Sequence, residues 1–159
     1  MIVPRMIVIS AKPFEAVVGA FAGAVGHPDL GALQSHLGAA QNIVEVEGVI
    51  RGALGESGFM EFARYDLGAF LRKESGRDTP KIIRFVVGNP LIMKEMVKHV
   101  PDAGSYAPVT VLIDERADGV HLSYDTMVGF LSPYGNERAL SVARELDAKV
   151  ERLLRQAAA

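Results

Sequence analysis

The sequence predicts an α+β fold in which a curved antiparallel sheet of about five strands packs against a long C-terminal helix. Three observations predict it: apolar runs of strand length recur along the chain, a hairpin signal joins the last two of them, and a helical apolar stripe closes the chain. No linker is long enough to divide the sequence. Residues 1–159 are therefore expected to form a single domain.

The first part of the chain is typical of one strand followed by helices. Residues 6–10 form a short apolar run that predicts the first strand, and residues 14–25 carry apolar side chains at helical spacing. Two further helices are predicted over residues 28–37 and 43–53. Residues 44–46 also fit a strand.

Two strands and a helix are expected next. Residues 59–65 predict a strand, whereas residues 67–73 fit no single element. Residues 81–87 are almost continuously apolar, which is typical of a central strand that is covered on both faces. A helix is predicted over residues 91–99.

A hairpin and a long helix complete the fold. Residues 109–115 and 120–124 flank Asp118-Gly119, a strong hairpin signal. Asn136 is a suitable helix cap. The helix that follows carries an apolar stripe made of Leu140, Ala143, Leu146, Val150, Leu153 and Ala157.

Composition restricts the function. The chain has no cysteine, which excludes thiolate catalysis and disulfides. The net charge of −2 and the dispersed basic residues argue against nucleic-acid binding. Residues 14–26 are too short for a membrane span, and no signal peptide is recognisable, so we expect a cytoplasmic protein.

Known motifs for metals and cofactors are missing from the sequence. The four histidines show no metal-ligand spacing, and there is no phosphate loop or dinucleotide fingerprint. We therefore expect no metal and no cofactor.

Gly88-Asn89-Pro90 follows the strand over residues 81–87 and is the first candidate site. Asn89 could present its amide to a ligand beside the N–H groups of the next helix. Alternatively, these residue types only build the turn. The second interpretation is favoured, because such a turn needs these residues in any case.

Five more polar residues are candidates. Asp66 and Asp125 end two strands and could act as an acid–base pair if they lie close together. His121 is either a proton donor or a polar residue on the less buried face of its strand. Tyr106 and Tyr124 either border a pocket or pack their rings and hydrogen-bond their hydroxyls.

Several spaced motifs resemble those of the Domain of Unknown Function 302 family: Phe85-Val-Val-Gly-Asn-Pro90, Met96, Pro101 to Pro108, Ser123-Tyr-Asp125, and Ala143-x-x-Leu-Asp-x-Lys149. The resemblance implies an arrangement like that of the TATA-binding protein, a curved antiparallel sheet gripped by a long helix. It brings no activity. Thr126 to Leu131 departs from the proline and serines that usually follow the Tyr-Asp pair in the family.

Three functions remain open. The first is binding of a small hydrophobic or amphipathic molecule between sheet and helix, in a cavity lined by Phe62, Phe85, Leu112 and Leu122. The second is an enzyme that uses Asp66, His121 or Asp125 as an acid or base. The third is a structural role as a homo-oligomer, which the low net charge and the apolar content of 49% favour. We expect the ligand-binding function, with a small molecule as partner and self-association of the chain.

Overall fold

The computed structural model describes all 159 residues and has one five-stranded antiparallel sheet in the order β1-β5-β4-β3-β2. The strands are β1 (Arg5–Ser10), β2 (Met60–Asp66), β3 (Ile82–Gly88), β4 (Val109–Arg116) and β5 (Gly119–Asp125). The longer helices are α1 (Phe14–Ala24), α2 (Leu30–Ala39), α3 (Ile43–Ala53), α4 (Gly68–Ser75), α5 (Pro90–Val97) and α7 (Glu137–Ala158). Short turns of helix, η1 (Pro101–Ser105), α6 (Met127–Leu131) and η2 (Ser132–Tyr134), fill the remaining connections. The predicted α+β fold is confirmed.

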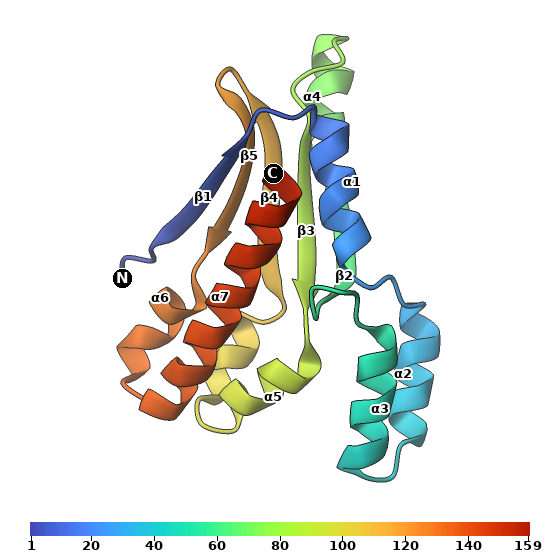
Figure 1. Cartoon of the computed structure of the whole chain (residues 1–159), viewed down its shortest axis with the longest axis vertical. Coiled ribbons are helices and arrows are strands. Elements are labelled where there is room, and N and C mark those ends of the chain that lie inside the picture. The colour runs from blue at the N-terminus through green and yellow to red at the C-terminus, as the bar shows by residue number, and fades with distance from the viewer.

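One face of the sheet is covered by α1 and α7 (Figure 1). Alternate strand residues point to this face, among them Phe85, Val111 and Leu122, and all three are buried. The ring centroid of Phe85 lies 4.7 Å from that of Phe21 on α1. Alternation along the strands therefore places the main core between the sheet and these two helices.

The apolar stripe of α7 faces the sheet, as the sequence predicts. Asn136 caps the helix by accepting a hydrogen bond from the N–H of Ala139. Buried residues of the helix recur every three or four positions, and Leu154 widens the stripe next to Leu153: Ala139, Ala143, Leu146, Val150, Leu153, Leu154 and Ala157. Burial against the sheet explains this stripe without any helix-to-helix dimer.

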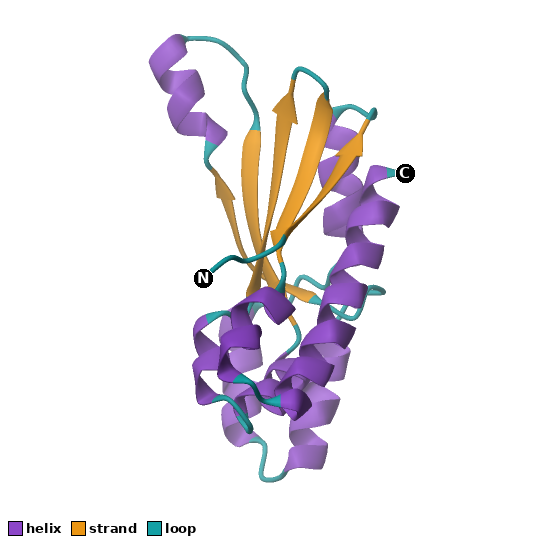
Figure 2. Cartoon of the chain, turned by 90° about the vertical axis from the view of Figure 1, so that its left-hand side faces the viewer, coloured by secondary structure: helices purple, strands orange, loops and turns teal.

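The opposite face of the sheet has no helical layer (Figure 2). The prediction that residues 81–87 are covered on both faces is therefore wrong. Arg84 is exposed on this face, and Ile82 and Val86 are only half-buried. A nearly continuous apolar run arises here because half-buried positions of the open face also carry aliphatic side chains.

The α2–α3 pair forms a separate lobe below the sheet (Figure 1). Its small core consists of Leu33, Ile50 and Met60. Gly26 and Gly55 tie this lobe to the sheet, because their N–H groups both donate to the carbonyl oxygen of Phe59 at 2.8 and 2.9 Å. A Cβ at Gly26 would lie 1.9 Å from the carbonyl oxygen of Ala53, so only glycine fits there.

Two uncertain stretches of the sequence are helical. Residues 44–46 belong to α3, which Asn42 caps through the N–H of Glu45. Residues 68–75 form α4, which ends at Gly76 in the left-handed conformation. The hairpin between β4 and β5 is confirmed, with Ala117 and Asp118 as its loop and Gly119 as the first strand residue.

Candidate functional site

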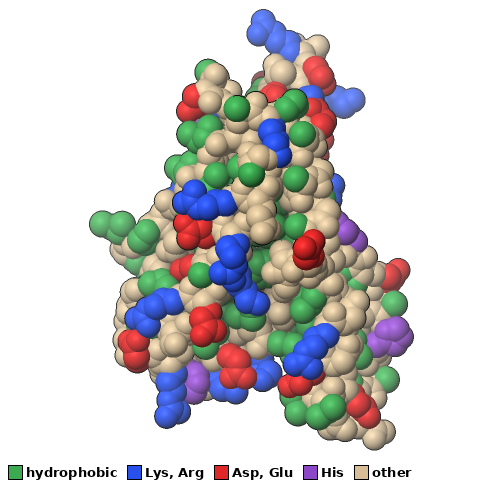
Figure 3. Space-filling model, viewed as in Figure 1, with side chains coloured by type: hydrophobic (Ala, Val, Ile, Leu, Met, Phe, Trp, Pro, Cys, Tyr) green, Lys and Arg blue, Asp and Glu red, His purple; other side chains and the backbone are tan.

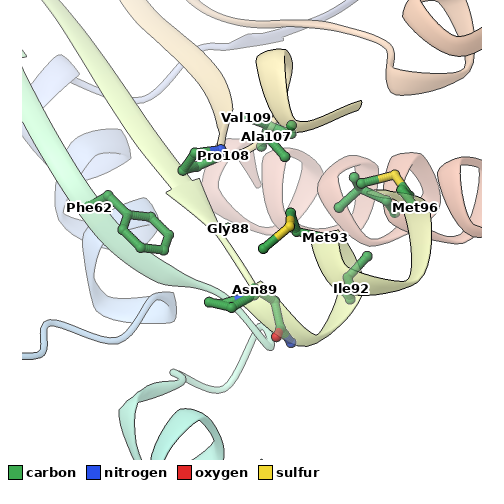
Figure 4. Close-up of a pocket in the computed structure, with 12 residues that line it drawn as sticks. Phe62, Gly88, Asn89, Ile92, Met93, Met96, Ala107, Pro108 and Val109 are labelled. Carbon is green, nitrogen blue, oxygen red and sulfur yellow. The ribbon is translucent and has the colours of Figure 1, made fainter. Parts of the chain in front are cut away.

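A pocket of about 270 Å³ opens at the end of β3, beside α5 and the segment that leads into β4 (Figure 4). Its lining is almost entirely apolar and comes from five parts of the chain: Phe62, Gly88, Asn89, Pro90, Ile92, Met93, Met96, Gly104, Ala107, Pro108, Val109 and Leu146. Concave apolar sites of this kind are where proteins bind small molecules. This pocket is the candidate functional site.

A bulge in β2 brings Phe62 to the pocket. Glu61 pairs with Val87 and Ala63 pairs with Val86, so Phe62 is an extra residue between two regular pairs. A bulge locally redirects the bulged strand. Figure 4 shows the ring of Phe62 beside the end of β3.

Gly88 has no side chain, which leaves room for the residues on either side of it in the pocket wall. A Cβ at this position would lie 3.2 Å from the Cβ of Pro108 and 3.4 Å from Cε2 of Phe62. The first distance is tighter than most real Cβ contacts, and the second is an ordinary van der Waals contact. The glycine therefore lets Phe62 and Pro108 approach the backbone of β3 from either side.

Asn89 lines the pocket, but its amide is engaged within the chain. Its Oδ1 accepts a hydrogen bond from the N–H of Leu91 at 2.9 Å, and its Nδ2 donates to the carbonyl oxygen of Gly58 at 3.1 Å. The N–H groups of Ile92 and Met93 donate to the carbonyl oxygen of Asn89. The turn interpretation of Gly88-Asn89-Pro90 is therefore the one that the geometry supports, and no free anion-binding N–H groups remain at this helix start.

Two methionines of α5 form the flexible part of the lining. Met96 is buried and Met93 is half-buried, and Figure 4 shows both beside Ile92 on the same helix. Methionine side chains have several rotatable bonds and adapt to different shapes. The pocket therefore combines a rigid wall at Gly88 and Pro108 with an adaptable one on α5.

The cavity expected between the sheet and α7 is filled. Phe85 and Leu122 are fully buried in the main core. Leu112 points to the opposite face, and only Phe62 of the four predicted residues lines the pocket. The open volume therefore lies at the rim of the sheet rather than beneath the helix.

Asp66 and Asp125 do not come together. Successive antiparallel pairings from β2 to β5 make these two strands run in opposite directions, with β3 and β4 between them. Since each aspartate ends its strand, the two carboxylates lie at opposite ends of the sheet. An acid–base pair made of these residues is excluded.

Each of the two aspartates has a local structural partner. Asp66 accepts hydrogen bonds from the N–H of Ala69 at 3.1 Å and from Arg72 at 2.7 Å, so it fixes the start of α4. Asp125 pairs with Arg5 at 2.7 Å across β1 and β5, and this carboxylate raises the pKa of Arg5. Both contacts are exposed ion pairs of the kind that contributes little to stability.

His121 lies on the open face of β5 rather than in a cleft. It is 7% exposed, and its Nε2 lies 2.6 Å from Oδ1 of Asp118 in the hairpin loop. This contact lowers the pKa of Asp118. Neither Asp66 nor Asp125 converges with it, so the three residues of the enzyme hypothesis form no common site.

Tyr124 packs in the core and does not border the pocket at β3. It is 2% exposed, and its hydroxyl donates to Oδ1 of Asp147 on α7 at 2.6 Å. The same carboxylate accepts hydrogen bonds from the N–H groups of Met127 and Val128 at 2.8 and 3.1 Å. Burial and the charge of Asp147 raise the pKa of Tyr124. Asp147 thus joins α7, β5 and α6.

Tyr106 does not line the pocket at β3, but it borders a separate groove of about 380 Å³ together with Tyr124 and Asp125. Its ring stacks on Phe130 with centroids 4.6 Å apart, and its hydroxyl lies 3.2 Å from that of Tyr134. This contact raises the pKa of Tyr134. Of the five predicted ligand-binding residues, only Asn89 lines the pocket.

The residues that sequence reasoning missed are those whose role depends on remote parts of the chain. Gly104, Pro108 and Leu146 line the pocket from three separate parts of the chain. Asp147 carried a signal in the sequence only as part of the motif Ala143-x-x-Leu-Asp-x-Lys149. Its burial depends on the contact with β5 and α6, which the sequence does not display.

The comparisons agree with this architecture. The family model of the Domain of unknown function DUF302 matches residues 35–157. The chain belongs to this family. The crystal structure of an uncharacterized conserved DUF302 protein from Bacillus stearothermophilus is similar over 96% of this chain and 97% of that chain, with a TM-score of 0.67 and 8% identity. No curated protein sequence matches.

The DUF302 motifs map onto the structure in two groups. Phe85 to Pro90 runs through β3 into the wall of the pocket, and Tyr124 and Asp147 form the contact between β5 and α7. Elsewhere, no group of three or more potential metal ligands comes together. None of the helices combines the length and apolarity that crossing a membrane requires.

Proposed function

We propose that this DUF302 protein binds a small apolar molecule in the pocket at the end of β3. The observation that carries the proposal is the nearly complete lack of free polar groups in a concave site of about 270 Å³. At the ~30 Å³ that one water occupies in the liquid, this volume has room for about nine water-sized groups. A compact apolar molecule fits such a volume.

Desolvation favours an apolar occupant over a charged one. The amide of Asn89 is already paired on both sides, so a buried charge would find no partner in the lining. An amphipathic ligand would have to leave its polar end outside the pocket. The adaptable side chains of Met93 and Met96 favour tolerance of several ligand shapes.

Filling the pocket tests this function. The neutral dye N-phenyl-1-naphthylamine, excited outside the tryptophan absorption band, gains fluorescence in an apolar site. We expect it to bind the wild-type protein, and the substitution Met93→Trp to weaken binding at least tenfold because the indole occupies the volume. Native mass spectrometry of the freshly purified protein checks for a co-purified molecule.

The matched control is Val44→Trp, which adds the same side chain at an exposed position of α3. Val44 is 74% exposed and does not line the pocket. This variant should bind the dye as the wild type does. Equal binding by Met93→Trp and the wild type would contradict the proposal.

Two further expectations from the sequence stay predictions: a cytoplasmic location and an arrangement like that of the TATA-binding protein.

A further inference from the structure

The face of the sheet without helices keeps large apolar side chains exposed at both of its edges. Ile7 and Ile9 on β1 are 52% and 50% exposed, and Tyr65 on β2 is 49% exposed. Next to β2, the helix α4 extends past the end of the sheet on the side away from α7 (Figure 2) and carries Phe70, which is 77% exposed. Single exposed apolar residues are ordinary, but Ile7, Ile9 and Tyr65 gather on one face of one sheet.

The register of the strands arranges the open face in rows. One row runs across all five strands as Tyr65, Arg84, Leu112, Ser123 and Ile7. The next row contains Ile82, Asp114, His121 and Ile9. In both rows the central residue belongs to β4, which is the middle strand of the five.

This arrangement is complementary to itself. Two copies can pack with their open faces together, related by a two-fold axis that runs parallel to β4 between the two sheets. This rotation places β1 of one copy opposite β2 of the other, and β5 opposite β3. Each row of one copy then faces the same row of the other. The rotation places Tyr65 of one copy opposite Ile7 of the other, and Leu112 opposite its own counterpart. Because β1 and β2 run in the same direction, Ile9 and the start of α4 lie at the same end of the sheet. The helix α4 then covers Ile9 of the second copy.

Charge is complementary in the same arrangement. Arg84 projects from β3 and forms no ion pair within its own chain; its guanidinium contacts only the hydroxyl of Thr110 at 3.3 Å and lies 5.7 Å from the ring of Tyr65. The two-fold axis brings Arg84 opposite Ser123 of the second copy, two residues from Asp125 on the same strand. Asp125 already pairs with Arg5 of its own chain, so Arg84 of the second copy joins an existing ion pair.

The size of the face fits a stable pair. Five strands spaced ~4.8 Å apart and about seven residues long at ~3.3 Å per residue give a flat area of roughly 550 Å². A standard interface takes about 800 Å² from each partner, and α4 supplies additional area. A groove of about 380 Å³ over Leu112 and Ser123 provides space for side chains of the second copy.

We propose that the open face of the sheet binds a second copy of this chain, in a symmetric dimer whose two-fold axis runs along β4. The occupant is the same chain because the apolar side chains at the two edges of the face match each other under this one rotation. Asp114, which the axis sets opposite its own counterpart, is neutralised within its own chain by Arg116. The interface leaves the pocket at the end of β3 to bind its ligand independently.

The lack of cysteine in the chain allows a direct test of the axis. Leu112→Cys should form a disulfide-linked dimer under mild oxidation, since the axis places residue 112 against itself. Ile7→Cys and Tyr65→Cys should each stay uncrosslinked alone and form a heterodimer when mixed. Val44→Cys, exposed on α3, is the control that should not crosslink.

Two outcomes would overturn this proposal. Self-crosslinking of Ile7→Cys without that of Leu112→Cys would place the contact between copies at β1 rather than about β4. A wild-type protein that sediments as a monomer at micromolar concentration would exclude the dimer.

Sedimentation of surface variants gives an independent measurement. Phe70→Asp and Arg84→Glu should each raise the dissociation constant of the dimer at least tenfold, the first by removing an apolar contact and the second by placing two acidic groups together. Both side chains are exposed, so circular dichroism should report an unchanged fold. A dissociation constant that neither variant changes would contradict the interface, and dye binding in the pocket should stay unchanged in both variants.

Discussion

The two faces of the sheet carry side chains from the same five strands and have opposite environments. Behind α1 and α7, the apolar residues at the centre of the sheet are buried, and aromatic rings such as those of Phe85 and Phe21 contact each other directly. On the open face, Arg84 and Ile7 stay in contact with solvent, and the buried residues of its centre are polar: Asp114, His121 and Ser123. For neighbouring residues such as Arg84 and Phe85, burial therefore depends on the face to which the side chain points.

The hydrophobicity of a strand therefore does not by itself predict whether both of its faces are covered. Val86 and Phe85 are adjacent apolar residues of β3, yet only Phe85 is fully buried. The covered face stabilises the monomer. The apolar residues left on the open face are available to a second copy.

The largest expected effect on stability comes from truncating a buried side chain on the covered face. Phe85→Ala removes a fully buried ring that contacts Phe21 and lies under the guanidinium of Arg64. We expect a loss of about 4 kcal/mol in the free energy of unfolding, measured by urea denaturation. Val86→Ala, its neighbour on the open face, should cost less than about 1 kcal/mol under conditions where the protein is monomeric. Similar losses for the two variants would show that the faces do not differ.

The next effect concerns the contact that holds α7 against the covered face. Asp147→Ala leaves the hydroxyl of Tyr124 and the N–H groups of Met127 and Val128 without an acceptor. We expect a loss of about 3 kcal/mol in urea denaturation, because unpaired buried donors are costly. Glu145→Ala, on the exposed side of the same helix, should change stability by less than about 0.5 kcal/mol. A small effect of Asp147→Ala would mean that apolar packing alone holds the helix.

The smallest effect depends on pH. The pKa of Tyr124 is raised in the folded protein by burial and by Asp147, so folding favours the protonated phenol. This contribution is fully present below the ordinary tyrosine pKa of about 10 and is lost as the pH rises above it. Tyr124→Phe removes it.

Urea denaturation at pH 8 and pH 11 measures this contribution. At pH 8 the variant should be less stable than the wild type by about 1–2 kcal/mol, for the lost hydrogen bond to a carboxylate. Between the two pH values, the wild type should lose more stability than the variant. Parallel pH dependence of the two proteins would contradict a buried phenol at this position.

Part of the fold could be predicted because it depends on local patterns. Val120, Leu122 and Tyr124 alternate with polar neighbours and lie on the covered face, and the stripe of α7 lies against them. The DUF302 family itself could be recognised from spaced motifs. Residues 67–73 gave no clear pattern because α4 packs only weakly on the sheet and therefore needs no continuous apolar stripe.

The site could not be predicted in the same way. Asp66 and Asp125 both end strands, but their distance depends on strand order and direction, which neither residue reveals. The pocket is formed by the bulge at Phe62, by Gly88, which has no side chain, and by the side chain of Leu146 from the distant α7. Among the polar candidates only Asn89 lines the pocket, because it belongs to a turn that the sequence displays locally, and Phe62 is the one predicted apolar residue that does.

The sequence by itself determined which segments are extended or helical, which side of each is apolar, and the family to which the chain belongs. Spacing of apolar residues along the chain is enough for that. Tertiary structure alone decided that one face of the sheet stays open and that a pocket forms at the end of β3. Both depend on which remote segments meet, and contacts between remote segments leave no regular period in the sequence.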